Sequence, residues 1–104
     1  MIEFPKIIDD IVSLHGDDSS DYIREIWKDY WVCNISREAS ILARNEVLTG
    51  KAKFGIVGDG KEVPQVALAR AFRKGDFKAG YYRDQTFMMA LGVCSIEDFF
   101  AQLY

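Results

Sequence analysis

One short segment, Tyr81-Tyr82-Arg83-Asp84, combines side chains that can bind an anion. The guanidinium of an arginine such as Arg83 has a planar fork that can hold phosphate oxygens through two hydrogen bonds. The phenol of Tyr82 adds a hydroxyl donor on a stiff ring. The pattern after Asp84 becomes helical, and the N-terminus of a helix presents N–H groups to an anion. The segment therefore indicates either a phosphate-binding site or a surface ion pair between Arg83 and a carboxylate such as that of Asp84.

The other residues that could do chemistry give weaker indications. The tripeptide Gly58-Asp59-Gly60 lacks the third glycine of a dinucleotide-binding fingerprint, because position 63 is a valine. His15 is the only histidine, and Cys33 and Cys94 lie far apart along the chain, so these residues cannot assemble a zinc site. Cys94 is a lone thiol just before Ser95 with no visible activator in the sequence, and we therefore expect a structural role for it.

Helices must position these residues, because apolar residues recur at helical spacing through most of the chain. The predicted helices are Pro5–His15, Asp21–Thr49, Glu62–Phe72, Asp84–Leu91 and a last helix that follows a capping-box-like Ser95-Ile96-Glu97-Asp98. Two short segments, Phe54–Val57 and Phe77–Tyr82, are candidates for extended structure. The expected fold class is a mostly α-helical piece with one or two short strands.

The longest predicted helix carries an apolar stripe near its start. The stripe residues are Ile23, Ile26, Trp27, Tyr30 and Trp31. They occupy positions i, i+3, i+4, i+7 and i+8, which is the spacing of one helix face. We expect this face to pack in the core, with a partner-binding surface as the alternative.

Composition and charge exclude several classes of protein. The chain has 104 residues and 11.9 kDa, which is enough for one domain. No apolar run approaches the ~18 residues of a membrane span, and the N-terminus lacks the pattern of an export signal, so we expect a cytoplasmic location. A pI near 5.1 argues against binding to nucleic acid. The charge is nevertheless uneven: residues 1–30 have a net charge of −5, and residues 51–83 have +5, which is compatible with an anion-binding surface.

From about Ile41 to Tyr104 the order of short segments resembles one family, the alpha subunit of thiamin-diphosphate-dependent 2-oxo acid dehydrogenases. The resemblance extends over about 64 residues. In chain order the segments are LTGKAKF (Leu48–Phe54), GKEVPQVALARAF (Gly60–Phe72), KGD (Lys74–Asp76), YYRD (Tyr81–Asp84), LG (Leu91–Gly92) and EDFFAQLY (Glu97–Tyr104). The likeness around Phe54 and YYRD favours the branched-chain (2-oxoisovalerate) type over the pyruvate type.

The resemblance implies roles for three residues. Tyr82 and Arg83 match the family's tyrosine–arginine pair, which contacts the diphosphate of the cofactor, and Phe54 matches an aromatic residue near the substrate side chain. It assigns no catalytic residue and no metal ligand to this chain. Gly58-Asp59-Gly60 is not the family's magnesium motif, because no asparagine follows position 45. The resemblance places that motif beyond residue 104, and the last helix is also short of a stop signal, so we expect the chain to end inside a longer protein.

The resemblance also implies the function. It describes an N-terminal helical arm (residues 1–18) and the first part of an α/β thiamin-diphosphate-binding domain (residues 19–104). The enzyme would decarboxylate a 2-oxo acid with thiamin diphosphate and Mg²⁺ and transfer the acyl group to the lipoyl group of an acyltransferase component. A beta subunit, or a fused beta half, would complete the site, and residues 1–104 alone would be inactive. The alternative is a non-catalytic helical module for protein interaction.

Overall fold

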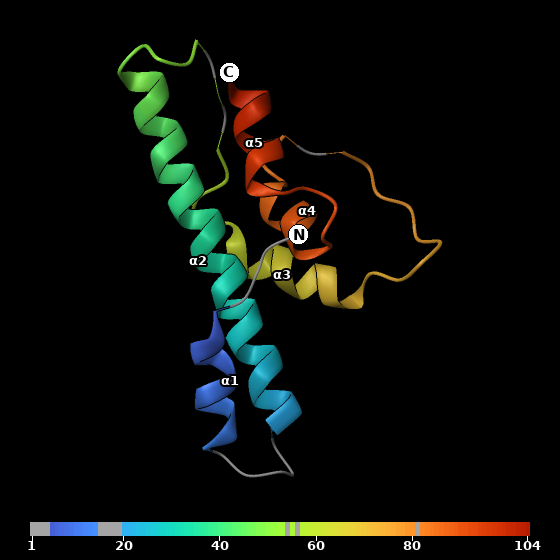
Figure 1. The fold of residues 1–104 in the computed structure, drawn as a ribbon. Coiled ribbons are helices and arrows are strands. Elements are labelled where there is room, and N and C mark those ends of the chain that lie inside the picture. The colour runs from blue at the N-terminus through green and yellow to red at the C-terminus, as the bar shows by residue number, and fades with distance from the viewer. Residues whose placement is uncertain (1–4, 15–19, 54, 56, 81) are drawn as a thin grey trace.

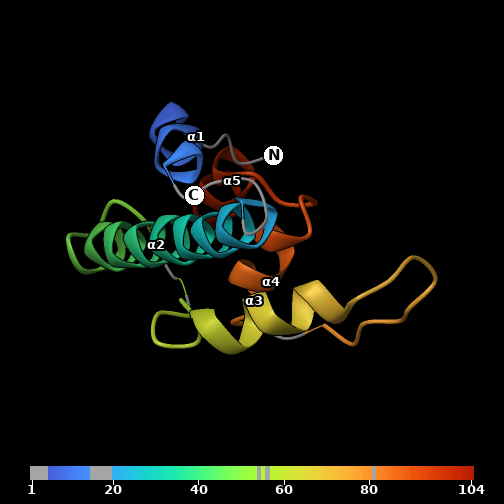
Figure 2. The same cartoon turned by 90° about the horizontal axis from the view of Figure 1, so that it is seen from below.

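The computed structural model describes residues 5–14, 20–53, 55, 57–80 and 82–104, and these residues are mostly α-helical. The helices in this part of the chain are α1 (Lys6–Ser13), α2 (Ser20–Leu48), α3 (Glu62–Ala71), α4 (Gln85–Ala90) and α5 (Ile96–Leu103). Figure 1 shows α2 as the long axis of the molecule, with α1 running back along its first half. Seen from below, α1 and α3 lie on opposite sides of α2 (Figure 2). The long central helix therefore carries the other elements.

The ends of the helices follow local sequence signals. Ser95 caps α5: its hydroxyl accepts from the Asp98 N–H at 3.0 Å, and the Asp98 carboxylate accepts from the Ser95 N–H at 3.0 Å. This reciprocal pair is a capping box with aspartate in the place of glutamate. After α2 the backbone turns at Gly50, whose φ of +80° favours a residue without a Cβ. The predicted helices are thus confirmed, and wherever the predicted and observed ends are both described they differ by at most one residue.

The predicted strands are wrong for the residues that the structure describes. Gly55 and Val57 belong to no strand, and residues 77–80 form an exposed loop between α3 and α4. An extended segment becomes a strand only when a neighbouring segment pairs with its backbone, and neither of these segments has such a partner in the described chain. Apolar content alone was therefore insufficient to predict a strand here.

The buried stripe of α2 is not the one that apolar spacing predicts. The buried residues of α2 are Val32, Ser36, Ala39, Ser40 and Ala43, and they share one face of the helix. Four of these five side chains are serine or alanine, so the backbone of a neighbouring helix can come close. In the expected stripe, by contrast, Ile26 and Tyr30 are 48% and 60% exposed, and the other three residues are only half-buried. Although α2 has 29 residues, neither it nor another described helix is long and apolar enough to cross a membrane.

The core lies where α2, α3 and α4 meet. Val32, Val66 and Met89, one from each helix, form a buried cluster. Phe87 of α4 is also buried and meets the ring of Phe72 edge-on, with 5.5 Å between the centroids. Edge-to-face contacts of this kind are favourable because the positive ring edge meets the negative ring face. The short helix α4 is therefore held between the two longer ones.

Two arginines fasten α3 to α2, one at each end of α3. At its start, Arg37 donates to both carboxylate oxygens of the buried Glu62, at 2.6 and 3.1 Å. At its end, Arg70 donates to the Asp29 carboxylate at 2.5 Å and to both the carboxylate and the backbone carbonyl of Glu25 at 2.9 Å. Bidentate arginine contacts fix orientation as well as distance. The position of α3 along α2 is therefore set by charged contacts in addition to the core.

Candidate functional site

A buried polar layer fixes the start of α4 on α2. The hydroxyls of Ser36 and Thr86 lie 2.5 Å apart, and the Gln85 side chain donates to the Ser40 hydroxyl at 2.9 Å. All four side chains are buried. Hydrogen bonds between buried groups permit few other arrangements, because an unpaired buried polar group is costly. Tyr82 and Arg83 come just before Gln85 in the chain. Their backbone therefore leads directly into a helix whose position these hydrogen bonds fix.

Gln65 of α3 holds the same segment from the other side. Its amide nitrogen donates to the Arg83 carbonyl at 2.8 Å, and its amide oxygen accepts from the Phe87 N–H at 3.0 Å. The second contact occupies one of the N–H groups that the first turn of α4 would otherwise offer to an anion. With only six residues in α4, anion binding in this region depends on side chains more than on the helix terminus.

Arg83 has no carboxylate partner among the described residues. Its Nη1 donates to the Val57 carbonyl at 3.3 Å, and its guanidinium lies over the Tyr82 ring, 5.7 Å from the centroid. The adjacent Asp84 forms its ion pair with Lys78 instead. Among the described residues, no ion pair joins Arg83 to Asp84, the first partner that the alternative reading of YYRD names. The guanidinium retains N–H donors for an anion.

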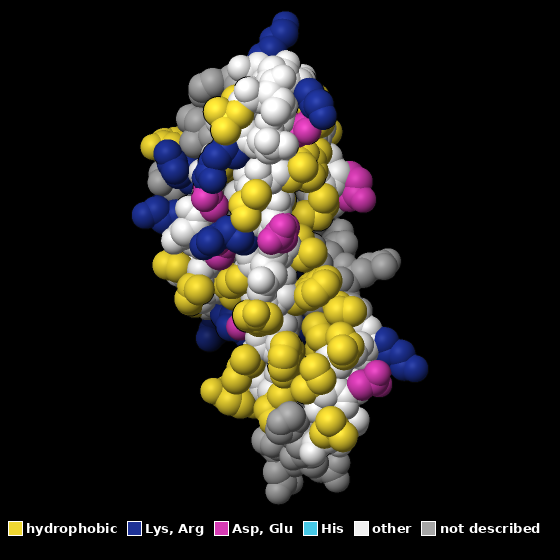
Figure 3. Space-filling model, turned by 90° about the vertical axis from the view of Figure 1, so that its left-hand side faces the viewer, with side chains coloured by type: hydrophobic (Ala, Val, Ile, Leu, Met, Phe, Trp, Pro, Cys, Tyr) yellow, Lys and Arg dark blue, Asp and Glu magenta, His cyan; other side chains and the backbone are white. Residues whose placement is uncertain are grey.

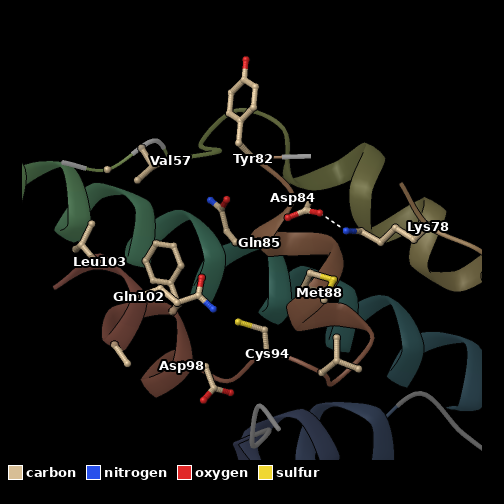
Figure 4. A pocket seen from close by; sticks show the side chains of 14 residues that line it. Val57, Lys78, Tyr82, Asp84, Gln85, Met88, Cys94, Asp98, Gln102 and Leu103 are labelled. Carbon is tan, nitrogen blue, oxygen red and sulfur yellow. Dashed lines mark hydrogen bonds and ion pairs between the residues drawn. The ribbon is translucent and has the colours of Figure 1, made fainter. Parts of the chain in front are cut away.

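A hollow of about 760 Å³ opens beside this segment, between the loop before α4 and helix α5 (Figure 4). Tyr82 and Asp84 line it, whereas Arg83, between them, is not among the described lining residues. The Lys78–Asp84 ion pair lies in its wall, and Gln85 comes from its floor. The Tyr82 side chain is 67% exposed, and Figure 4 shows its hydroxyl pointing away from the other labelled side chains. The structure thus brings Tyr82 and Arg83 together at the rim of the hollow and not at its centre.

The glycine-rich segment before α3, Gly58-Asp59-Gly60, has a structural role. A Cβ on Gly58 would lie 2.7 Å from the Arg83 carbonyl oxygen and 2.9 Å from the Gln85 amide, closer than such atoms approach. Asp59 pairs with Arg44, and this hydrogen bond lowers the pKa of the Asp59 carboxyl. The tripeptide therefore allows the chain to pass against Arg83, and its carboxylate is used in an ion pair.

Charge around Glu62 is compensated within the chain. The hydrogen bond from Arg37 is the main cause that lowers the pKa of the Glu62 carboxyl, and burial opposes it. The Gly60 N–H adds a third donor at 2.9 Å. A buried carboxylate with three donors remains ionised and cannot serve readily as a proton donor or acceptor. Glu62 is therefore a structural anchor of α3.

The remaining candidates add no second site. Phe54, the predicted substrate-side residue, lies outside the described residues. Cys33 and Cys94 are free thiols, and burial is the main cause that raises the pKa of each. A raised pKa leaves little thiolate at neutral pH, which favours structural roles. Within the described ranges, no three His, Cys, Asp or Glu side chains are grouped so that they could hold a metal ion.

Sequence reasoning predicted Tyr82 and Arg83 as binding residues from their side-chain types alone. It missed the residues that position them, which are Gln65, Gln85, Ser36 and Ser40. The spacing of two serines by four residues inside α2 was the one available signal, since it places both hydroxyls on one helix face.

Comparison with protein-family models, with curated proteins and with solved structures gives no match to this chain.

Proposed function

We propose that this chain supplies the diphosphate-contacting segment of a thiamin-diphosphate-dependent 2-oxo acid dehydrogenase of the alpha-subunit type. The order of the six sequence segments from Leu48 to Tyr104 supports the proposal. The observation that carries it is the state of Arg83: a guanidinium without a carboxylate partner in the described chain, beside a tyrosine, on a backbone that Gln65 holds. A cation in this state can bind phosphate oxygens without first breaking an ion pair.

The residues present fit one part of the cofactor, its diphosphate. Arg83 would bind the phosphate oxygens, and Tyr82 would add its hydroxyl after a change of side-chain rotamer. Thiamin diphosphate, when bound, supplies the chemistry of decarboxylation, while the protein binds and orients it. The Mg²⁺ ligands and the residues that activate the cofactor would come from outside residues 1–104. We accordingly expect residues 1–104 alone to be inactive.

The substrate and the partners follow from the same resemblance. We propose a branched-chain 2-oxo acid as the substrate, with pyruvate as the alternative. A beta subunit or a fused beta half would cover the open hollow beside Tyr82 and Asp84. A lipoyl-bearing acyltransferase component would receive the acyl group. These roles belong to a cytoplasmic multienzyme complex, and Phe54 keeps its proposed place on the substrate side.

The phosphate contact can be tested on this chain with inorganic pyrophosphate followed by NMR. The Arg83 side-chain Nε–H and the nearby backbone N–H signals should shift, with an apparent Kd on the order of millimolar for one charge-assisted contact. Arg83→Ala should remove these shifts, and Arg73→Ala, in the exposed loop after α3, should leave them unchanged. Shifts that survive Arg83→Ala, or that centre on Arg73, would contradict the proposed site.

The assembled enzyme gives the stronger test. Arg83→Ala should raise the Kd for thiamin diphosphate roughly 10- to 100-fold, because a charge-assisted hydrogen bond contributes about 1.5–3 kcal/mol. Micromolar binding of thiamin diphosphate to residues 1–104 alone would contradict the expected division of the site between chains.

A helical interaction module is the second candidate, and one observation favours it. Large hydrophobic side chains of α2 outside the buried stripe are exposed, among them Tyr30, Ile41 and Leu48. A module of this kind does not use the guanidinium of Arg83. If pyrophosphate shifts the NMR signals of the Arg83→Ala variant as it shifts those of the wild-type chain, the module would be favoured over the enzyme.

A further inference from the structure

A mostly exposed apolar line runs along the face of α2 opposite its buried stripe. Tyr30, Ile41 and Leu48 are 60%, 47% and 78% exposed, and Ile23 is half-buried. Separations of 7 and 11 residues are close to two and three full turns, so these four positions lie within about 20° of one another around the helix. Figure 3 shows hydrophobic side chains gathered on the side of the molecule formed by α1 and α2. Single exposed hydrophobic residues are ordinary, but four on one line indicate a contact surface.

The spacing of this line is the same when read in either direction. Ile23 and Leu48 are equally far from the point between Ile35 and Ser36, and so are Tyr30 and Ile41. Two copies of α2 placed antiparallel about that point bring Ile23 of one copy opposite Leu48 of the other. They also bring Tyr30 of one copy opposite Ile41 of the other. A twofold interface needs this self-complementarity, in which one surface serves both partners.

We propose that two copies of this chain associate through α2 in this antiparallel arrangement. This inference goes beyond the proposed function and does not depend on it, because it involves neither the hollow nor Arg83. The four apolar residues form the contact, and the polar residues between Tyr30 and Ile41 determine its register.

The charges near the line permit this contact. Arg37 and Arg44 lie beside it, and each is already paired within its own chain, Arg37 with Glu62 and Arg44 with Asp59. Two copies can therefore approach without bringing unpaired guanidinium groups together. The same arrangement places Asn34 of one copy opposite Arg37 of the other. The amide nitrogen of Asn34 donates to the Tyr30 carbonyl at 2.8 Å, which leaves its oxygen as an acceptor for that guanidinium.

The contact is long enough for a stable pair. The 25-residue separation from Ile23 to Leu48 corresponds to about 37 Å of helix. Helices in contact over this length bury on the order of 1,000 Å² in total, which is the lower range for a specific interface. In this arrangement α4, which packs on the buried stripe, lies away from the contact, whereas α1 and α3 pack on the two sides of α2 that flank it.

Sedimentation analysis of this chain tests the proposal. The wild-type chain should form a dimer at roughly 10–100 μM. Tyr30→Lys or Ile41→Glu alone should raise the dissociation constant of the dimer about 30-fold or more, the scale of an interface hot spot. Leu68→Glu is a matched control, because Leu68 is 60% exposed but lies on α3, and it should leave the dimer unchanged. Circular dichroism should show the same helix content in all variants, since none of these side chains is buried.

The double variant Tyr30→Lys/Ile41→Glu tests the direction of pairing. In the antiparallel arrangement each introduced lysine faces an introduced glutamate of the other copy, so the dimer should return. A parallel arrangement places like charges opposite each other and keeps the double variant monomeric. A monomeric double variant would therefore overturn the proposed register. A wild-type chain that stays monomeric throughout the range would overturn self-association and leave a different protein as the occupant of this face.

Discussion

Ser36 and Thr86 are fifty positions apart in the chain, and their hydroxyls lie 2.5 Å from each other in the contact between α2 and α4. Both side chains are completely buried. Each hydroxyl is the hydrogen-bond partner of the other, so the pair joins the central helix to the segment that carries the candidate site. The stability of that segment should depend on both residues together.

Ser36→Ala should lower the free energy of unfolding by about 1–3 kcal/mol, because the Thr86 hydroxyl would remain buried without its partner. The double variant Ser36→Ala/Thr86→Val should cost less than the sum of the two single variants, since it leaves no unsatisfied group. Urea denaturation of the four proteins measures the coupling. Additive effects would show that the two hydroxyls do not depend on each other.

Gly58→Ala should destabilise the chain by about 1–3 kcal/mol, because the new methyl group would meet the Arg83 carbonyl and the Gln85 amide. Gly80→Ala is the matched control, since no atom lies within 4 Å of a Cβ built there, and its effect should stay within about 0.5 kcal/mol. Thermal unfolding compares the two variants. Equal effects would contradict the close approach of the loop before α3 to Arg83.

Lowering the pH should reduce the stability of the folded chain, and part of this loss should come from Glu62. Its pKa in the folded state lies below the ordinary value of 4.5, mainly through the hydrogen bond from Arg37, so its stabilising contribution is complete above pH 4.5. That contribution should be lost as the pH falls through the lowered pKa. Glu62→Gln has no carboxyl to protonate and should show a shallower loss of stability below pH 4.5. The measurement is the urea midpoint between pH 7 and pH 3, and identical profiles would contradict this role.

Local signals were sufficient to predict the helices. The capping box at Ser95 and the glycine after α2 act within a few residues, so their effect can be recognised without the rest of the fold. The anion-binding types of Tyr82 and Arg83 are informative for the same reason. What they do in the fold depends on Gln65, which lies about eighteen residues away and whose role no local pattern indicates.

The face of α2 that packs in the core was predicted wrongly, and the reason is physical. Apolar spacing identifies a face that avoids water, but α2 has apolar residues around much of its circumference, so spacing alone cannot say which face the rest of the chain covers. The covered face is the one with small residues, because Ser36, Ala39 and Ser40 let another backbone come near. Tyr30 and Ile41 are too large for so close a contact and remain on the outer side.

The arginine ion pairs at the two ends of α3 bear on how the chain tolerates changes of sequence elsewhere. Arg37 with Glu62 and Arg70 with Asp29 hold α3, and through it Gln65, without any help from residues 73–77. That stretch can accept insertions, deletions or a graft of foreign sequence while the guanidinium of Arg83 keeps its place. It is therefore a natural position for a reporter peptide or an affinity tag.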